Sequence, residues 1–224
     1  MKQVESLWQT VDDYLVETFL PDEPAFAAAL GDSDAAGLPT IQVSPTQGRL
    51  LELLARALGA RNILEIGTLG GYSTLWLARG LPKGGRIVTL ELEPKHAEVA
   101  RKNFARAGRQ DVIELKLGAA LETLPRLVAE GAGPFDLIFV DADKANLADY
   151  FTWSVKLSRP GTLILVDNVI RDGEVVNASS TDEMVQGVRR MNERIAAEPR
   201  VSATVLQTVG AKGYDGLAFV VVDR

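Results

Sequence analysis

The sequence contains no cysteine among its 224 residues. Disulfides, thiolate metal sites and cysteine nucleophiles are therefore excluded, and a cytoplasmic location is the one we expect. The net charge of −6 argues against a large nucleic-acid surface. No apolar run approaches the roughly 18 residues of a membrane span, and the N-terminus lacks a signal-peptide core. We therefore expect neither a membrane nor a nucleic-acid partner.

A glycine-rich turn is the most informative segment that is present. Residues 62–66 have strand character, Gly67-Thr68-Leu69-Gly70-Gly71 follows, and a helical pattern starts at Tyr72. Such a junction presents backbone N–H groups and a helix N-terminus to a nucleotide-like ligand. The spacing is G-x-x-G-G, not the dinucleotide fingerprint G-x-G-x-x-G, and Glu65 precedes the first glycine, where it can meet a cation or a ligand amine. The alternative is a tight connection with no ligand.

A second acidic residue ends the next strand. Residues 86–91 form an apolar strand that closes with Glu91, roughly 20 positions beyond the glycine turn. An acid at this position is placed to accept hydrogen bonds from ribose hydroxyls, and the alternative is a solvated strand end. The single histidine, His96, falls on the following helix and is predicted to face solvent.

The chain as a whole alternates between strand and helix patterns after three N-terminal helices. This pattern predicts a doubly wound, mostly parallel α/β sheet with helices on both faces, as one domain over residues 1–224 with residues 1–59 as a helical cap. We predict the first helices over residues 4–20, 24–30 (closed by Gly31-Asp32-Ser33) and 45–58. Strands are predicted over residues 62–67, 86–91, 111–117, 135–140, 161–167, 201–207 and 216–223. Further helices are predicted over residues 72–80, 95–107, 119–130, 144–158 and 182–197.

Polar residues follow two strands of this predicted sheet. Asp141-Ala142-Asp143-Lys144 comes directly after the strand 135–140, and Asp167-Asn168 ends the strand 161–167. The carboxyl ends of parallel strands open on one side, so Asp141, Asp167 and Asn168 can converge as an all-oxygen set suited to Mg²⁺, Mn²⁺ or Ca²⁺. The alternatives are a helix cap for Asp141 and a turn for Asp-Asn. Zinc is disfavoured, because cysteine is absent and His96 lies away from this edge.

Other catalytic classes lack their motifs. Ala145 occupies the position where aspartyl-phosphate chemistry needs a hydroxyl, and neither G-x-x-x-x-G-K-[ST] nor G-x-S-x-G occurs.

Three motifs together resemble those of the cation-dependent O-methyltransferases, the family of caffeoyl-CoA and catechol O-methyltransferases. They are Ile-Leu-Glu-Ile-Gly-Thr-x-x-Gly-Tyr-Ser, Val-Asp-Ala-Asp-Lys and Asp-Asn-Val, and the likeness extends over residues 41–217. The resemblance implies a class I methyltransferase fold, with a seven-stranded sheet that has one antiparallel edge strand, and a homodimer.

The resemblance also implies roles for individual residues. It assigns the metal to Asp141, Asp167 and Asn168, with Mg²⁺ first and Mn²⁺ or Ca²⁺ as alternatives, and catalysis to Lys144 and Asp141. The alternative for Lys144 is a surface helix lysine. The resemblance places S-adenosylmethionine against Val43, Glu65, Gly67, Thr68, Ser73, Glu91, Ala120 and Asp143.

The resulting functional hypothesis is divalent-cation-dependent transfer of a methyl group from S-adenosylmethionine to a hydroxyl of a small catechol-like or other phenolic acceptor. An alternative is methylation of hydroxylated uridine in tRNA, with Arg189, Arg190 and Arg194 as candidate contacts. A nicotinamide-dependent oxidoreductase is disfavoured by the missing dinucleotide fingerprint.

Three positions depart from the family pattern and leave the acceptor open. Arg171 stands where many relatives have tryptophan, and Asp172 where the plant branch has a substrate-contacting asparagine. Ala218 replaces a glutamate that holds the second hydroxyl in the catechol branch, so we expect mixed regiochemistry.

Overall fold

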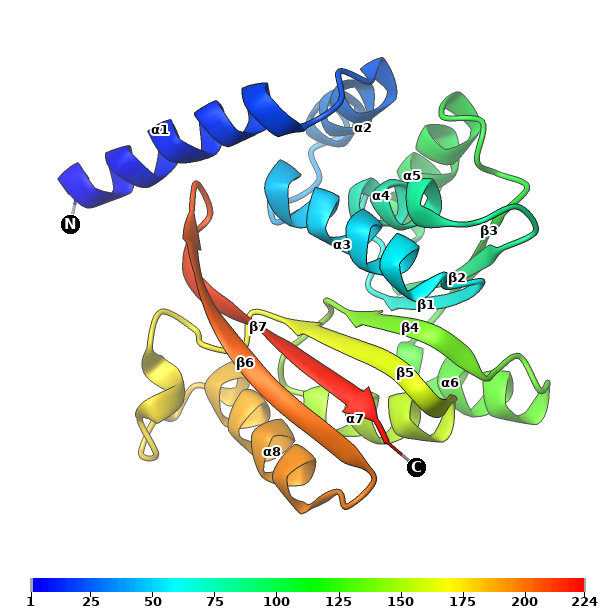
Figure 1. Cartoon of the computed structure of the whole chain (residues 1–224), viewed down its shortest axis with the longest axis vertical. Coiled ribbons are helices and arrows are strands. Elements are labelled where there is room, and N and C mark those ends of the chain that lie inside the picture. The colour runs from blue at the N-terminus through cyan, green and yellow to red at the C-terminus, as the bar shows by residue number, and fades with distance from the viewer. Residues whose placement is uncertain (1, 224) are drawn as a thin grey trace.

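The computed structural model describes the backbone of residues 2–223 and the side chains of residues 7–223. Three helices come first and are followed by alternating strands and helices, as Figure 1 shows. The helices are α1 (Lys2–Phe19), α2 (Pro24–Ala35), α3 (Pro45–Leu58), α4 (Tyr72–Gly80), α5 (Pro94–Arg106), α6 (Ala120–Ala129), α7 (Leu147–Lys156), η1 (Glu174–Val176) and α8 (Glu183–Ala197). The strands are β1 (Asn62–Ile66), β2 (Arg86–Glu91), β3 (Ile113–Leu117), β4 (Phe135–Val140), β5 (Ser158–Asp167), β6 (Val201–Gly210) and β7 (Gly213–Val222).

The strands form one sheet in the order β3-β2-β1-β4-β5-β7-β6. Neighbours from β3 to β5 are parallel, whereas β7 is antiparallel to both β5 and β6. The predicted seven-stranded, mostly parallel sheet is confirmed, with β7 as the antiparallel strand of the β6–β7 edge. The chain order reverses between β1 and β4, and such a switch point opens a crevice at the carboxyl ends of the strands. The glycine turn after β1 and Asp141 after β4 both lie there.

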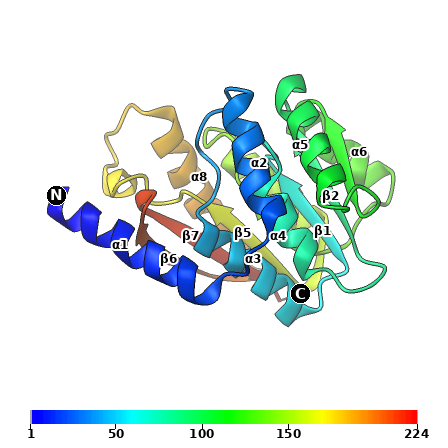
Figure 2. The ribbon, with the colours of Figure 1, turned by 90° about the horizontal axis from the view of Figure 1, so that it is seen from above.

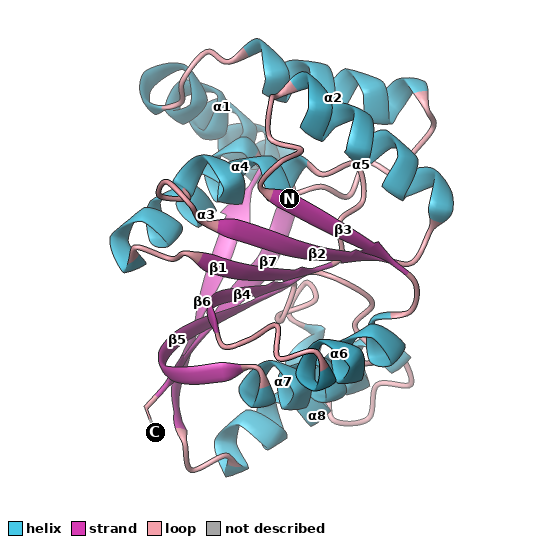
Figure 3. Ribbon diagram, turned by 90° about the vertical axis from the view of Figure 1, so that its right-hand side faces the viewer, coloured by secondary structure: helices cyan, strands magenta, loops and turns pink. Residues whose placement is uncertain are grey.

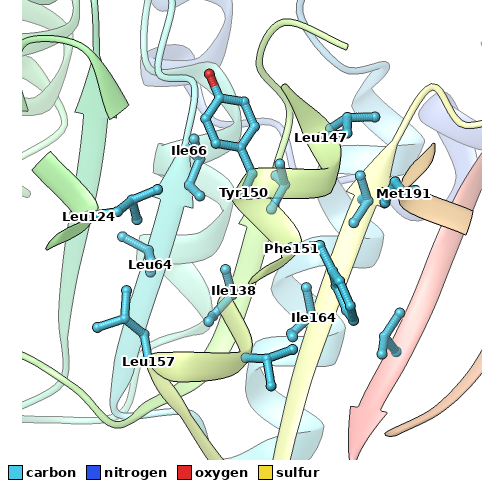
Figure 4. Packing of buried hydrophobic residues seen from close by; sticks show 14 of the residues in the cluster. Leu64, Ile66, Leu124, Ile138, Leu147, Tyr150, Phe151, Leu157, Ile164 and Met191 are labelled. Atoms are coloured by element: carbon cyan, nitrogen blue, oxygen red, sulfur yellow. The ribbon is translucent and has the colours of Figure 1, made fainter. Parts of the chain in front are cut away.

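Helices cover both faces of the sheet, as Figure 3 shows, with α3, α4 and α5 on one side and α6, α7 and α8 on the other. Successive residues of β1 serve opposite layers, because Ile63 packs with Trp76 and its neighbours while Leu64 packs with Phe151 and its neighbours. Figure 4 shows the cluster that contains Leu64 and Phe151, in which α7 lies on the sheet. Burial on both faces explains why the central strands β1, β4 and β5 are mostly apolar where they are buried.

Local sequence signals predicted some helix ends correctly and others wrongly. Helix α3 has the predicted bounds: Ser44 Oγ accepts a hydrogen bond from Gln47 N at 3.2 Å, and Gly59 ends the helix with φ 60°. The prediction that α2 ends near Leu30 is wrong. The helix continues through Gly31 to Ala35, and the glycine in the left-handed region is Gly37, at φ 67°. Glycine in a helix interior costs stability but does not stop the helix.

The predicted start of α7 at residue 144 is also wrong, since the helix begins at Leu147. Asp143 Oδ1 accepts a hydrogen bond from Asn146 N at 3.2 Å, which closes a turn before the helix. Lys144 therefore lies in this turn and not on a helix.

Helix α1 lies beside the β6–β7 hairpin, as Figure 2 shows from above. Ala211 N, in the turn between the two strands, donates to Asp12 Oδ2 at 2.7 Å. Neither α1 nor any other helix within the described residues has the length and apolar character needed to cross a membrane.

Candidate active site

The glycine turn after β1 passes against the end of β4. Gly67 has φ 101°, and a Cβ built there would lie 2.0 Å from the Asp141 carbonyl oxygen. Only glycine permits this approach of two backbones. Gly71, with φ 82°, then leads into the first turn of α4. The turn and the first of the strand-end aspartates are thus brought together by backbone packing.

Glu91 organises this turn from the end of β2. Its Oε2 accepts hydrogen bonds from Thr68 N at 3.2 Å and Leu69 N at 2.7 Å, and its Oε1 accepts one from Glu93 N at 2.9 Å. The side chain is 7% exposed. The alternative of a solvated strand-end carboxylate is therefore excluded.

His96 corrects a sequence prediction. It does not face solvent: its side chain is 20% exposed, and Nδ1 lies 3.4 Å from Glu91 Oε1. Helix α5 starts at Pro94, immediately after the end of β2, so its first turn folds back over the strand end. His96 consequently lines the same cavity as Glu91.

Glu65 lies beneath the turn and is completely buried. Its carboxylate accepts hydrogen bonds from Ser73 Oγ at 2.6 Å, Thr74 Oγ1 at 2.5 Å and Thr89 Oγ1 at 2.6 Å. Thr89 Oγ1 also lies 2.6 Å from Thr68 Oγ1, which connects Glu65 to the turn. Burial raises the pKa of Glu65 from 4.5 to about 7, although the three hydroxyl contacts act in the opposite direction.

Lys144 and the partly buried Asp141 form an ion pair on the β4 side of the crevice. Lys144 Nζ lies 2.8 Å from Asp141 Oδ1, and Lys144 is only 6% exposed. The alternative of a surface lysine is therefore excluded. The turn that carries Lys144 is held by Asp143, whose Oδ2 accepts a hydrogen bond from Tyr150 Oη at 2.5 Å.

Asp167 lies at the end of β5 and is 6% exposed. Its Oδ2 accepts a hydrogen bond from Gln47 Nε2 at 2.7 Å, and its Oδ1 accepts one from Asn168 N at 2.8 Å. Burial, and after it the charge of Asp141, raises the pKa of Asp167 to about 7. Asn168 follows with φ 58°, a conformation that asparagine tolerates better than most residues.

One cavity of about 630 Å³ connects these groups. Ten residues of the sequence prediction line it: Val43, Gly67, Thr68, Ser73, Glu91, Ala120, Asp141, Asp143, Lys144 and Asn168. Glu65 and Asp167 are not among the lining residues. Glu65 accepts a hydrogen bond from Ser73 and Asp167 accepts one from Asn168, and both donor residues line the cavity. Within the described residues there is no group of three or more His, Cys, Asp or Glu side chains that could hold a metal ion. The predicted metal set has two carboxylates and one amide, so it is not such a group.

The chain is similar to known proteins that are named as O-methyltransferases. A family model described as O-methyltransferase matches residues 30–220. The chain is 52% identical to a catechol O-methyltransferase of Niastella koreensis over 216 residues, which cover 96% of this chain and 98% of the relative. It is 53% identical to a catechol O-methyltransferase of Mycobacterium tuberculosis over 212 residues, 95% of this chain and 94% of the relative. The solved structure of an O-methyltransferase from Bacillus cereus in complex with SAH has 55% identity and a TM-score of 0.97, with 98% of this chain and 100% of that chain covered.

The chain belongs to the O-methyltransferase family. It is of the caffeoyl-CoA and catechol type, so the family that the sequence predicted is confirmed. It is an S-adenosylmethionine-dependent O-methyltransferase, as predicted, and the nicotinamide-dependent alternative is wrong.

The tRNA alternative gains no support from the methyltransferase structure. The three arginines of α8 are engaged within the protein: Arg189 donates to Val175 O, Arg190 to Ala145 O and Arg194 to Thr152 Oγ1. The relatives from Niastella koreensis and Mycobacterium tuberculosis are both named catechol O-methyltransferase.

Several functional residues of the methyltransferase escaped sequence reasoning. Gln47 contacts Asp167 across 120 positions of the chain, and nothing local signals this contact. Tyr150 and Met184 line the cavity from α7 and α8. One sequence signal could have identified Tyr150. It lies seven residues after Asp143, within the first turns of the next helix, and donates a hydrogen bond to Asp143.

Ala218 lies in the core of the sheet. It is 1% exposed, pairs with Val166 and Val205 in the sheet, and packs in the apolar core. It does not line the cavity and offers no contact to a second hydroxyl, so the expected mixed regiochemistry stays a prediction.

Proposed function

We propose that this methyltransferase acts, with a divalent cation, on one hydroxyl of a small catechol-like or other phenolic acceptor. The observation that carries the proposal is a single cavity that joins the glycine turn and Glu91 to the Lys144–Asp141 pair. A methyl donor and an acceptor hydroxyl can then occupy one space, where positioning lowers the barrier to transfer.

The methyl donor belongs on the side of β1 and β2. Glu91 is exposed to the cavity and accepts hydrogen bonds from the ribose hydroxyls, in addition to the backbone contacts that fix its carboxylate. Val43 and Ala120 give apolar contact, and Ser73 faces the cavity while donating to Glu65. Glu65 is thus a positioning residue, since it acts on the donor through Ser73.

The residues on the other side fit a hard divalent cation. Asp141, Asp167 and Asn168 offer only oxygen ligands from carboxylates and an amide, which suit Mg²⁺, Mn²⁺ or Ca²⁺. The pKa of Asp167 is raised to about 7 by burial and by Asp141, and a cation offsets such a concentration of carboxylates. When bound, the cation supplies Lewis-acid stabilisation of the acceptor's phenolate.

Lys144 is the residue that accepts the proton of the acceptor's hydroxyl in this proposal. Lys144 Nζ lies 2.8 Å from Asp141 Oδ1 in the cavity wall, which is within hydrogen-bond distance. In the proposed reaction Lys144, as the neutral amine, takes the acceptor's hydroxyl proton and becomes an ammonium, while the phenol oxygen forms a bond to the methyl carbon as the carbon–sulfur bond breaks and S-adenosylhomocysteine leaves. Asp141 keeps Lys144 oriented during this step.

The proposal extends to a homodimer. Apolar side chains are exposed along α1, with Tyr14 63% and Phe19 65% exposed, and along β6, with Leu206 54% and Val209 57% exposed. Strand β6 is also a sheet edge, paired with β7 alone among the described strands. Exposed apolar surface and a free strand edge are both features of association sites.

The test is methyl transfer from labelled S-adenosylmethionine to a panel of catechols, with Mg²⁺ and with a chelator. We expect activity that the chelator abolishes, and its loss in Asp141→Ala with an unchanged fold and unchanged binding of S-adenosylhomocysteine. Asp149→Ala, which removes an exposed carboxylate of α7, is the matched control and should retain activity. Full, chelator-insensitive activity in Asp141→Ala would remove the cation from the proposal. Failure of the wild type to methylate any catechol would overturn the acceptor class.

A further inference from the structure

Arg171 occupies an unusual position after β5. It lines the same cavity as Lys144, and its side chain is 28% exposed. Its φ is 55°, as is that of Asp172, while Asn168 has φ 58°. Left-handed conformations at non-glycine residues cost free energy and concentrate at ligand-contacting sites, where the surrounding structure maintains them.

Asp215, at the start of β7, maintains this conformation. Its Oδ1 accepts hydrogen bonds from Ile170 N at 2.9 Å, Arg171 N at 3.1 Å and Gly216 N at 2.9 Å. The backbone of Arg171 is therefore fixed against the sheet, and the direction in which its side chain leaves is fixed with it. Asp215 Oδ2 also forms a long ion pair with Arg171 Nη1, at 3.9 Å, which is beyond hydrogen-bond distance and leaves the donors of Arg171 available.

The guanidinium group of Arg171 retains unused hydrogen-bond donors. Its Nη2 faces the thioether sulfur of Met184 at 3.9 Å, and thioethers are weak acceptors. Its Nε is buried and has no hydrogen-bond partner among the described residues. By contrast, Arg159 Nη2 lies 2.5 Å from Asp136 Oδ1. A buried donor without a partner is costly, so a ligand acceptor is favoured at Arg171.

The charge around the cavity leads to the same conclusion. Lys144 and Arg171 are the lysine and arginine side chains among the described residues that line it, and Lys144 is already paired with Asp141. The carboxylates of Glu91, Glu93, Asp141 and Asp143 line the cavity as well and would repel an anion. An anionic ligand can therefore be accommodated beside Arg171, whose charge offsets that repulsion.

We propose that Arg171 is the specificity-determining residue for an acceptor that carries a carboxylate, so that the preferred substrates are catechols with an acidic group. This inference rests on the proposed function of the same cavity. The planar guanidinium matches a carboxylate with two parallel hydrogen bonds, and a carboxylate is ionised at neutral pH. A neutral amide of the same shape offers one carbonyl acceptor and no charge, so it cannot make the second of the two parallel hydrogen bonds.

The experiment compares 3,4-dihydroxybenzoate with its neutral isostere 3,4-dihydroxybenzamide. The wild type should show a kcat/KM at least tenfold higher for the acid, mainly through KM. In Arg171→Met the acid should lose at least tenfold in kcat/KM while the amide changes less than about twofold, and Arg171→Lys should be intermediate. Arg126→Met, which removes a 70% exposed guanidinium from α6, should change neither substrate.

Calorimetric titration of both compounds into the complex with S-adenosylhomocysteine gives a second readout that does not depend on turnover. Equal kcat/KM and equal affinity for acid and amide in the wild type would overturn the inference and leave the proposed function intact. Binding of the acid that depends on Arg171, without methylation of either compound, would overturn the proposed function and support the inference. The wild-type comparison decides even where Arg171→Met fails to fold.

Discussion

Glu91 performs two tasks with one carboxylate. It accepts hydrogen bonds from the N–H groups of Thr68, Leu69 and Glu93, and it lines the cavity where the methyl donor is proposed to bind. Removal of this carboxylate therefore releases the turn and deletes the proposed acceptor for the ribose hydroxyls. Both effects act on affinity for the donor.

Glu91→Ala should weaken binding of S-adenosylmethionine by about 1–3 kcal/mol, the loss expected when hydrogen bonds to a charged group are removed. Isothermal titration calorimetry measures the change directly. Glu98→Ala, on the outer side of α5 and paired with Lys102, is the control and should bind normally. Unchanged affinity in Glu91→Ala would show that the ribose assignment is wrong.

Glu65 should make the stability of the protein depend on pH. Its folded-state pKa of about 7 lies above the ordinary value of 4.5, because burial disfavours the charged form. Between these two pH values the native state binds more protons than the unfolded state, so the free energy of unfolding falls as pH rises. The stabilisation is complete below pH 4.5 and is lost as pH rises through about 7.

Glu65→Gln removes this titration, so the difference in stability between the wild type and the variant should change over the same pH window. A pKa rise of this size corresponds to on the order of 3 kcal/mol. Urea unfolding between pH 5 and 8, in chelator so that cation binding does not contribute, gives the comparison. A parallel pH dependence in the two proteins would contradict the assignment of the titration to Glu65.

At the scale of elements, α8 fixes the turn that carries Lys144. Gly187 of α8 is buried, and a Cβ built there would lie 2.0 Å from Lys144 O and 2.8 Å from Ala145 Cα. These are backbone atoms that cannot rotate away, so helix and turn are in direct contact. The position of Lys144, the proposed proton acceptor, thus depends on a glycine that is 43 positions away in the chain.

Gly187→Ala should push α8 away from this turn. We expect a loss of about 1–3 kcal/mol in the free energy of unfolding, typical of overpacking, together with reduced kcat because Lys144 is displaced. Gly31→Ala is the matched control, since Gly31 lies inside α2 with nothing within 4 Å of a built Cβ. That change should leave kcat unaffected and stabilise the protein by up to about 1 kcal/mol. Equal effects of the two substitutions would contradict the close contact.

For the whole molecule, the surface formed by α1 and β6 is the one proposed to mediate the homodimer. The two elements are joined through Asp12 and the turn between β6 and β7, so their exposed apolar side chains belong to neighbouring parts of the fold. A monomer would leave this surface in water, at a cost that scales with its apolar area.

We therefore expect a dimer by light scattering at micromolar concentration, and dissociation to monomers when Leu206→Lys and Val209→Lys are combined. Val176→Lys is the control, because Val176 is 85% exposed but lies on η1. It should leave the dimer intact. A wild-type protein that is monomeric at these concentrations would contradict the homodimer proposal.

The sequence by itself determined the order of the elements and the backbone of the site. Apolar runs bounded by glycine specified the seven strands, Ser44 and Gly59 specified the ends of α3, and parallel strands necessarily bring the glycine turn and Asp141 to one edge. These features depend on residues that are close in the chain or on the regular geometry of a sheet. The sequence also predicted the family, because the motifs that contain these residues resemble those of the family.

Only the tertiary structure decided how individual side chains are used. Glu65 turns into the core toward hydroxyls of β2 and α4, His96 lines the cavity, Lys144 lies in a turn, and Gln47 contacts Asp167. Each outcome depends on which segments pack together across long separations, and on burial that shifts the pKa of a carboxyl group. A pattern in the sequence reports the periodicity of one segment, whereas burial and hydrogen-bond partners belong to the assembled molecule.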